Sequence, residues 1–279
     1  MINLVVDSGC DISKEKINHE QCNLSYVPLN LELEDKVYLD DEDLVIEDYL
    51  AHMEKSTVGV KTSAPSPNLF FERFKMGDNV FVVTLSSKLS ATYQSAMTAK
   101  RMYLDEYGKK FIHVFDSLTA SVGQGIIAMK ISELIKKGTH SLEEVVEHVN
   151  NYMKDTRTYF ILDKYDNLVK TGRINPYIAK IASFLNVKPI CGDQEGEIRL
   201  VDKARGYNKA VTKLVETIKN NTQNLEERIV AISHCKCYEK AVALKDEILK
   251  HLKVKDVLIE ECKGVIATYA NRGGIVMAL

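Results

Sequence analysis

Hydroxyl side chains crowd one short segment of this 279-residue chain, which runs from Thr84 to Ala96 as TLSSKLSATYQSA. An apolar run typical of a buried strand, 79–85, leads into it, and residues 91–103 have the composition of a helix. A short connection from a strand to a helix N-terminus points free backbone N–H groups and the positive end of the helix dipole at one spot. Such a spot suits an anion, and Ser90 is placed to be the N-cap. The alternative is a plain serine cap without a ligand.

A second candidate for anion binding is Arg173, which lies in the segment KTGRI just before a helix start at Asn175-Pro176. A guanidinium fork can hold a carboxylate through two hydrogen bonds. Two alternatives stay open, an exposed loop arginine and a salt bridge between domains. Asp7-Ser8 and Asp116-Ser117 each end a predicted strand, where ligand crevices open in α/β folds. Their alternative role is to cap the strands and pin the turns.

Signals for other chemistries are weak. The phosphate loop GxxxxGK(S/T) and the nucleophile elbow GxSxG do not occur in the sequence. Residues 123–128, GQGIIA, fit the spacing of a dinucleotide fingerprint, but the strand before them ends too early, at Asp116, so close backbone packing is favoured. The segment CKC at 235–237 holds the only close pair among six scattered cysteines, which favours reduced structural thiols over a metal site or disulfides. His234, at the end of an apolar strand, is expected to be structural rather than a catalytic base.

Strand and helix signals alternate along the chain, which predicts an α/β fold with largely parallel sheets. The predicted strands are 3–7, 26–32, 80–85, 111–116, 159–162, 187–191, 198–201, 228–234, 255–260 and 275–278.

Helix starts are marked by specific residues. Ser141 and Glu144 form a capping-box pattern that opens an amphipathic helix through Met153. Ser66-Pro67 and Asn175-Pro176 each place a cap before a proline at the first helical position. An apolar stripe over 127–135 ends at a glycine, as helix C-termini often do.

No linker or internal repeat divides the chain. The boundary is therefore predicted from element order alone, near Thr156, where the capping-box helix ends and a new strand begins. This gives an N-terminal α/β domain with the Thr/Ser anion site, residues 1–155, and a C-terminal α/β domain, residues 156–279, that contributes to the ligand pocket.

The composition is that of a soluble globular protein. The net charge of −2 gives no electrostatic basis for nucleic-acid binding. No apolar run reaches the roughly 18 residues that a membrane-spanning helix needs, and the strand-like start lacks the pattern of a signal peptide. A cytoplasmic location is expected.

Several motifs together resemble the DegV family of bacterial lipid-binding proteins. The most specific are TSAPSP at 62–67 and SSKLSATYQSA at 86–96, and further matches run in order along the whole chain. These further matches are VDS at 6–8, DS at 116–117, GQG at 123–125, TGRI at 171–174, KPI at 188–190 and KARG at 203–206. The chain departs from the pattern near its end, where ATYANRG at 267–273 replaces the family's GTHxGPG and Tyr269 replaces a ligand-contacting histidine.

The resemblance implies two different α/β domains with a long-chain fatty acid between them and no other cofactor. It implies that the ligand carboxylate is held by Thr and Ser hydroxyls and a helix N-terminus, with Arg173 near the head group. Arg272 falls where the family pattern has proline, and we expect it as a substitute cation. It further implies presentation of the fatty acid to a separate ATP-dependent kinase that makes an acyl phosphate, with transient contact to a membrane surface. Because the nucleophile elbow, the phosphate loop and a metal cluster are missing from the sequence, we expect no catalysis by this chain alone. The implied ligand-binding residues are Thr62, Ser63, Ser90, Ala91, Thr92, Arg173 and Tyr269.

Two other classes of function stay open at this stage. A stand-alone esterase-type enzyme would need an activated serine nucleophile. A sensor or binding protein for another small carboxylate or anion would carry a polar ligand instead of an acyl chain.

Overall fold

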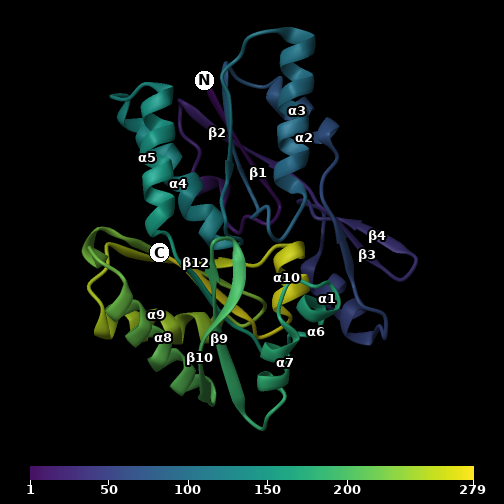
Figure 1. The fold of residues 1–279 in the computed structure, drawn as a ribbon, viewed down its shortest axis with the longest axis vertical. Helices are drawn as coiled ribbons and strands as arrows, with labels where there is room; N and C mark the ends of the chain where they lie inside the picture. The colour runs from purple at the N-terminus through teal and green to yellow at the C-terminus, as the bar shows by residue number, and fades with distance from the viewer.

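The computed structural model describes residues 1–279 and contains a four-stranded, a six-stranded and a three-stranded sheet. In Figure 1 the four-stranded sheet and its helices lie in the upper part of the molecule, and the six-stranded sheet with its helices lies in the lower part.

The four-stranded sheet is entirely parallel, as predicted, in the order β2-β1-β6-β7. Its strands alternate buried apolar side chains between two faces, so each face needs helical cover. Phe70, Phe74 and Ala96 from α2 and α3 cover one face, and Ile131 and Val149 from α4 and α5 lie over the other. The elements are β1 (Ile2–Asp7), β2 (Cys22–Val27), β6 (Asn79–Thr84), β7 (Ile112–Asp116), α2 (Pro67–Phe74), α3 (Thr92–Tyr107), α4 (Val122–Lys137) and α5 (Leu142–Asp155).

The six-stranded sheet, in the order β10-β9-β8-β13-β11-β12, is mostly antiparallel. Only β11 and β12 pair in parallel, so the prediction of largely parallel sheets is wrong for this half of the chain. The cause is topological: β9 returns directly into β10 through a hairpin, and β13 enters antiparallel between β8 and β11. The strands are β8 (Thr158–Ile161), β9 (Val187–Gln194), β10 (Glu197–Arg205), β11 (Ile229–His234), β12 (Asp256–Glu261) and β13 (Ile275–Ala278), and α8 (Tyr207–Asn221) and α9 (Tyr238–His251) cover one face.

A small antiparallel sheet in the order β4-β3-β5 stands beside these two sheets. The predicted single strand 26–32 is in fact the end of β2 and the start of β3, separated at Pro28, which has no N–H to offer a sheet ladder. Sequence reasoning missed β5, a three-residue strand that carries Thr62 and Ser63. The elements here are β3 (Asn30–Leu33), β4 (Lys36–Leu39), β5 (Lys61–Ser63) and the adjoining α1 (Ile46–Lys55).

Three short helices, α6 (Asp166–Lys170), α7 (Pro176–Ala182) and α10 (Gly264–Ala270), and two 3-10 turns, Lys14–Lys16 and Leu225–Glu227, complete the fold. The helix signals are confirmed: Ser141 and Glu144 form both capping-box hydrogen bonds, the Asn175 side chain accepts from Tyr177 N–H, and α4 ends at a left-handed Gly138. No helix combines the length and the hydropathy needed to cross a bilayer.

Every strand before Thr156 lies in the two N-terminal sheets, and every strand after it lies in the mixed sheet. One large apolar cluster nevertheless joins the two halves, since it contains Leu85 and Val122 from the first and Phe160 and Val276 from the second. The boundary between residues 155 and 156 therefore stays a prediction.

Candidate functional site

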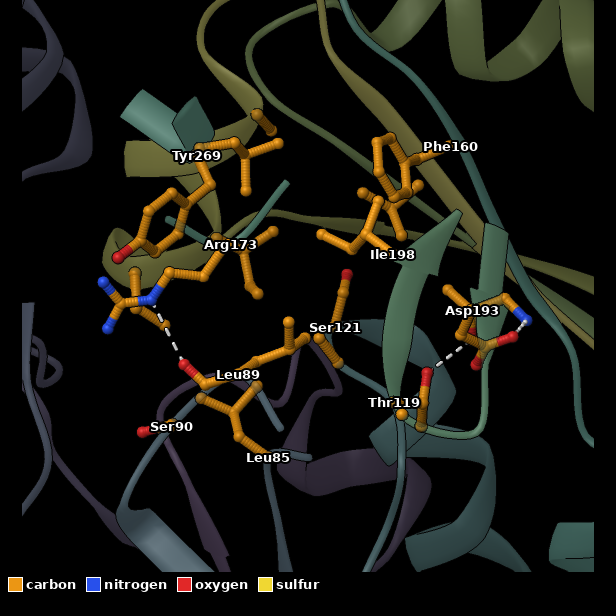
Figure 2. A pocket seen from close by; sticks show the side chains of 18 of the residues that line it. Leu85, Leu89, Ser90, Thr119, Ser121, Phe160, Arg173, Asp193, Ile198 and Tyr269 are labelled. Atoms are coloured by element: carbon orange, nitrogen blue, oxygen red, sulfur yellow. Dashed lines mark hydrogen bonds between the residues drawn. The ribbon is translucent and has the colours of Figure 1, made fainter. Parts of the chain in front are cut away.

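A pocket with an empty volume of about 880 Å³, including its open mouth, lies between the two halves of the chain. Most of its lining side chains are apolar, and Leu85 and Leu89 from the N-terminal half face Phe160 and Ile198 from the C-terminal half (Figure 2). An apolar pocket with a few polar groups is typical of a site for a small, mostly hydrophobic ligand.

One side of the pocket is polar, where Thr62, Ser90, Arg173 and Tyr269 line it. Thr62 Oγ1 lies 2.8 Å from the Tyr269 hydroxyl oxygen, which joins β5 to α10 across the two halves. The structure therefore brings together four of the seven predicted site residues.

Ser90 is not the N-cap of α3, because the helix begins one residue later than predicted, at Thr92, and Ala91 occupies the cap position. The Leu89 and Ser90 N–H groups both donate to the Ser86 carbonyl, and this tight turn holds Ser90 outside the helix. Its hydroxyl lies 2.8 Å from Thr92 Oγ1 and accepts a 3.3 Å hydrogen bond from Thr92 N–H. Ser90 still lines the pocket, whereas Ala91 is exposed and Thr92 is buried away from it.

Ser63 lies outside the pocket. Neighbouring residues of a strand point to opposite faces, so Thr62 and Ser63 cannot both reach one site. The Ser63 hydroxyl instead accepts from Asn30 Nδ2 at 3.3 Å and donates to Glu32 at 3.4 Å.

Arg173 is positioned by the end of α6, where Gly172 with φ +71° makes a left-handed turn and Arg173 N–H donates back to the Leu168 carbonyl at 2.8 Å. Its guanidinium donates to the carbonyl oxygens of Leu89, at 3.2 Å, and Thr171, at 2.7 Å. No carboxylate of the chain pairs with it, so the alternative of an inter-domain salt bridge is wrong. Arg173 thus lies at the pocket without a carboxylate partner of its own, because its hydrogen bonds go to neutral carbonyl oxygens.

Arg272, expected as a substitute cation, is directed elsewhere. It donates to Glu54 at 2.9 Å and to Glu47 at 2.6 Å, both on α1, and does not line the pocket. That expectation is wrong, because two carboxylates on the neighbouring helix hold the side chain.

Asp7 and Asp116 act as strand-end caps. Asp7 accepts from Gly9 N–H at 2.9 Å and Leu85 N–H at 2.7 Å, and burial raises its pKa to about 6. Asp116 accepts from Ser87 N–H at 2.9 Å and Leu118 N–H at 3.3 Å. Both carboxylates therefore fix the loops that carry pocket residues, without lining the pocket themselves.

The residues of the GQG segment are packed too closely for a nucleotide. A Cβ at Gly123 would lie 2.4 Å from the hydroxyl oxygens of Thr119 and Thr158. The prediction of close backbone packing at this segment is confirmed. His234 is buried, accepts from Cys237 N–H at 3.4 Å and has a pKa lowered by burial, which fits the expected structural role.

Sequence reasoning missed the opposite side of the pocket, where Thr119, Thr158 and Asp193 lie. Asp193 falls in the segment DQEG between two predicted strands, which reads as an exposed turn. The sequence offered one signal, the two predicted strands on either side of this segment. If these strands are paired as a hairpin, Asp193 lies on β9, opposite Ile198 of β10.

Comparison with known proteins decides the family. The model of the DegV family, described as a family of uncharacterised proteins, matches residues 1–278. The chain belongs to the DegV family. A DegV domain-containing protein from Streptococcus pyogenes serotype M1 is 32% identical, with 98% of this chain and 97% of that protein covered.

Two solved structures show the same DegV fold. A DegV family protein from Ruminococcus gnavus, solved with vaccenic acid, is 37% identical, with a TM-score of 0.92 over 100% of this chain and 99% of that one. The Streptococcus pneumoniae fatty acid kinase (Fak) B3 protein, loaded with linoleic acid, is 30% identical, with a TM-score of 0.92 over 99% of this chain and 98% of that one. The predicted family and the α/β fold with two different halves are both confirmed.

Proposed function

We propose that this DegV protein binds a long-chain fatty acid and presents it to a separate kinase for formation of an acyl phosphate. The acyl chain occupies the apolar slot, and the carboxylate lies beside Arg173, Thr62, Ser90 and Tyr269. The observation that carries the proposal is an apolar pocket with three hydroxyls and an arginine that has no carboxylate partner gathered on one side. The relatives solved with vaccenic acid and linoleic acid support it.

The energetics divide between the two parts of the ligand. Each buried methylene contributes roughly 0.8 kcal/mol, so a long chain supplies on the order of 10 kcal/mol before the costs of binding. Each hydrogen bond to the charged carboxylate adds about 1.5–3 kcal/mol. The chain therefore gives affinity, and the head group fixes which end of the ligand lies at Arg173.

The kinase role rests on the relative named as a fatty acid kinase B3 protein. In this role, the chain is the non-catalytic subunit that binds the lipid. No cofactor other than the fatty acid is part of the proposal. The role also implies a cytoplasmic location, where a kinase finds ATP.

A transient membrane contact fits the surface next to the head-group site. Tyr177 on α7 is 61% exposed, and Phe184 and Leu185, just after this helix, are 59% and 92% exposed. Lys180, on the same helix, supplies a positive charge for an anionic membrane surface. This surface follows Arg173 in the chain, so the proposed membrane contact lies on the same segment as the head-group arginine. Loss of vesicle binding in Leu185→Glu, with Leu249→Glu as an exposed control on α9, tests it.

Mass spectrometry of the ligand extracted from purified protein tests the proposed function. A long-chain monocarboxylic acid in near-stoichiometric amount is the expected result. Extraction of a small polar anion would instead favour a sensor, and ester turnover that depends on one serine would favour an esterase.

A further inference from the structure

The outer edge of the small sheet is open. The order β4-β3-β5 leaves β4 with a neighbour on one side only, and in Figure 1 the hairpin of β3 and β4 projects at the side of the molecule beside α1. Backbone groups along a strand point alternately to its two sides. Asp40 N–H, just after β4, donates at 2.9 Å to the Leu29 carbonyl, just before β3. By alternation, the N–H and C=O groups of Val37 and Leu39 point away from β3, and we call these four groups the β4 edge.

An open strand edge pairs readily with another chain, so natural proteins usually cover their edges. Two other edge strands of this protein are covered by side chains. The Tyr26 carbonyl of β2 accepts from Arg73 at 3.2 Å, and the Val257 carbonyl of β12 accepts from Lys245 at 3.2 Å. The β4 edge has no such cover, which is typical of a strand that pairs with a partner.

The side chains of β4 also leave this edge accessible. Val37 is 63% exposed and Leu39 is 44% exposed, and the two side chains lie on one face because they are two residues apart. Lysine often protects an edge, but the ammonium group of Lys36 lies 4.2 Å from the centre of the Tyr38 ring. A strand added beside β4 would therefore meet free backbone groups and two exposed apolar side chains.

The charge around the β4 edge is negative. Asp35 precedes the strand and Asp41 and Asp43 follow it, and all three are exposed. None of the three forms an ion pair, and Lys14 pairs instead with Glu42. A partner segment that carries lysine or arginine beside its strand would be attracted to this surface.

A second copy of this chain is a poor occupant of the edge. Antiparallel pairing that sets Val37 opposite Leu39 of the second copy also sets Asp35 opposite Asp41 of that copy, and the symmetry repeats the clash. Like charges directly opposite each other destabilise a strand pair. The occupant that fits is a different chain with basic residues.

The β4 edge lies near the head-group side of the pocket. Thr62 is on β5, at the opposite edge of the same three-stranded sheet. Neighbouring strands are about 4.8 Å apart, so a strand added to β4 would lie about 14 Å from β5. A protein docked there lies close to the carboxylate that a kinase must reach.

We propose that the kinase partner docks on this protein by pairing an extended, basic segment with the β4 edge. The inference rests on the proposed function, since it takes the partner to be the kinase that receives the fatty acid. Backbone pairing fixes the register of the segment, and its lysine or arginine residues lie beside Asp35, Asp41 and Asp43.

The test measures acyl phosphate formation by the purified cognate kinase, with ATP and the full-length protein loaded with vaccenic acid. Val37→Pro removes one outward N–H group, and a proline is tolerated at this position because that group has no partner inside the sheet. The variant should raise the protein concentration that gives the half-maximal rate by about tenfold or more. Val37→Thr, which keeps the N–H group and the branched shape, should stay within about twofold of the wild type.

The charge is tested by a double reversal, Asp35→Lys with Asp43→Lys. It should raise the same concentration by about tenfold at low salt, and by less at high salt. Asp105→Lys with Glu106→Lys, at the C-terminal end of α3, changes the net charge by the same amount and is the matched control. All these variants should bind vaccenic acid as the wild type does, because the changed residues lie outside the pocket.

A folded Val37→Pro protein with wild-type kinase kinetics would overturn the inference and leave fatty-acid binding intact. So would a charge reversal at β4 that costs no more than its control, and this result decides the case if Val37→Pro does not fold. A wild-type protein that binds no fatty acid, or from which the kinase makes no acyl phosphate, would overturn the proposed function, and the inference with it.

Discussion

At the scale of single residues, the head-group side of the pocket depends on one arginine and three hydroxyl groups of unequal value. Arg173 brings a charge without a carboxylate partner, whereas Tyr269 brings a neutral hydroxyl that already contacts Thr62. A charged hydrogen bond to a carboxylate is worth more than a neutral one. The affinity for a carboxylate should therefore depend chiefly on Arg173.

The first prediction compares these two residues. Arg173→Ala should weaken fatty-acid binding by about 2–3 kcal/mol, and Tyr269→Phe by about 1 kcal/mol. Arg272→Ala is the matched control, since Arg272 is held by Glu47 and Glu54 outside the pocket. Isothermal titration with one fatty acid measures all three, and a harmless Arg173→Ala would refute the head-group assignment.

The second prediction concerns pH. Tyrosine hydroxyls in general ionise near pH 10, whereas histidine side chains titrate near pH 6.5. Tyr269→His should therefore make the affinity rise as the pH falls between about 8 and 5, because a histidine cation would join Arg173 beside the carboxylate. Wild-type affinity measured over the same range is the control. A flat profile in the variant would show that position 269 does not reach the ligand.

At the scale of elements, the N-terminus of α10 is capped by a residue from the other half of the chain. Asp40, just after β4, accepts from Gly264 N–H and Val265 N–H, both at 2.8 Å. Asp11 accepts from the preceding Lys263 N–H at 2.7 Å. The helix that carries Tyr269 is therefore oriented by two buried carboxylates of the N-terminal half.

A third prediction follows for Asp40. Asp40→Ala should lower the free energy of unfolding by about 2 kcal/mol, since it leaves two helix N–H groups buried without an acceptor. It should also weaken ligand binding, because α10 would lose its fixed orientation. Asp41→Ala, at an exposed neighbouring position, is the control for urea unfolding. Unchanged stability in Asp40→Ala would mean that water replaces the cap.

The fourth prediction uses the pKa values of the same buried carboxylates. Burial raises the pKa of Asp40 to about 6 and that of Asp11 to about 7, above the usual value near 4. A raised pKa means that the folded state binds more protons than the unfolded state, so this contribution to stability is present at acid pH and is lost as the pH rises through about 6 to 7.

Asp11→Asn should therefore reduce the fall in unfolding free energy between pH 5 and pH 8 by about 2 kcal/mol. Urea unfolding of the wild type and the variant across this range measures the difference. A profile as steep as that of the wild type would show that Asp11 titrates as it does in the unfolded chain.

Element-level reasoning from sequence succeeded where local chemistry is decisive. The capping box at Ser141 and the cap-proline pair at Asn175 could be predicted from sequence, because each depends on neighbours within four residues. The antiparallel pairing of β13 and the short strand β5 could not be predicted from local sequence. β13 pairs with β8, more than a hundred residues away, and β5 pairs with β3, about thirty residues away.

At the scale of the whole molecule, the pocket forms where two sheets of different construction meet. The hydroxyl-rich segment 84–96 and Arg173 were predicted from sequence because hydroxyl and guanidinium groups are typical of anion-binding sites. Thr119, Thr158 and Asp193 were not found, since they come from three separate segments and only the folded chain brings them together. The two sides of one pocket thus differ in how far local sequence reveals them.

The position of β13 has a consequence for biosynthesis. This strand leaves the ribosome after every other strand, yet it occupies the interior of the mixed sheet, between β8 and β11. The parallel sheet can fold while translation continues, but β8 and β11 have no direct contact in the sheet until β13 arrives. Val276 on this strand also lines the pocket. A nascent chain from which β13 has not yet emerged should therefore expose an unpaired sheet edge and be unable to retain lipid, so that lipid binding has to await the emergence of β13.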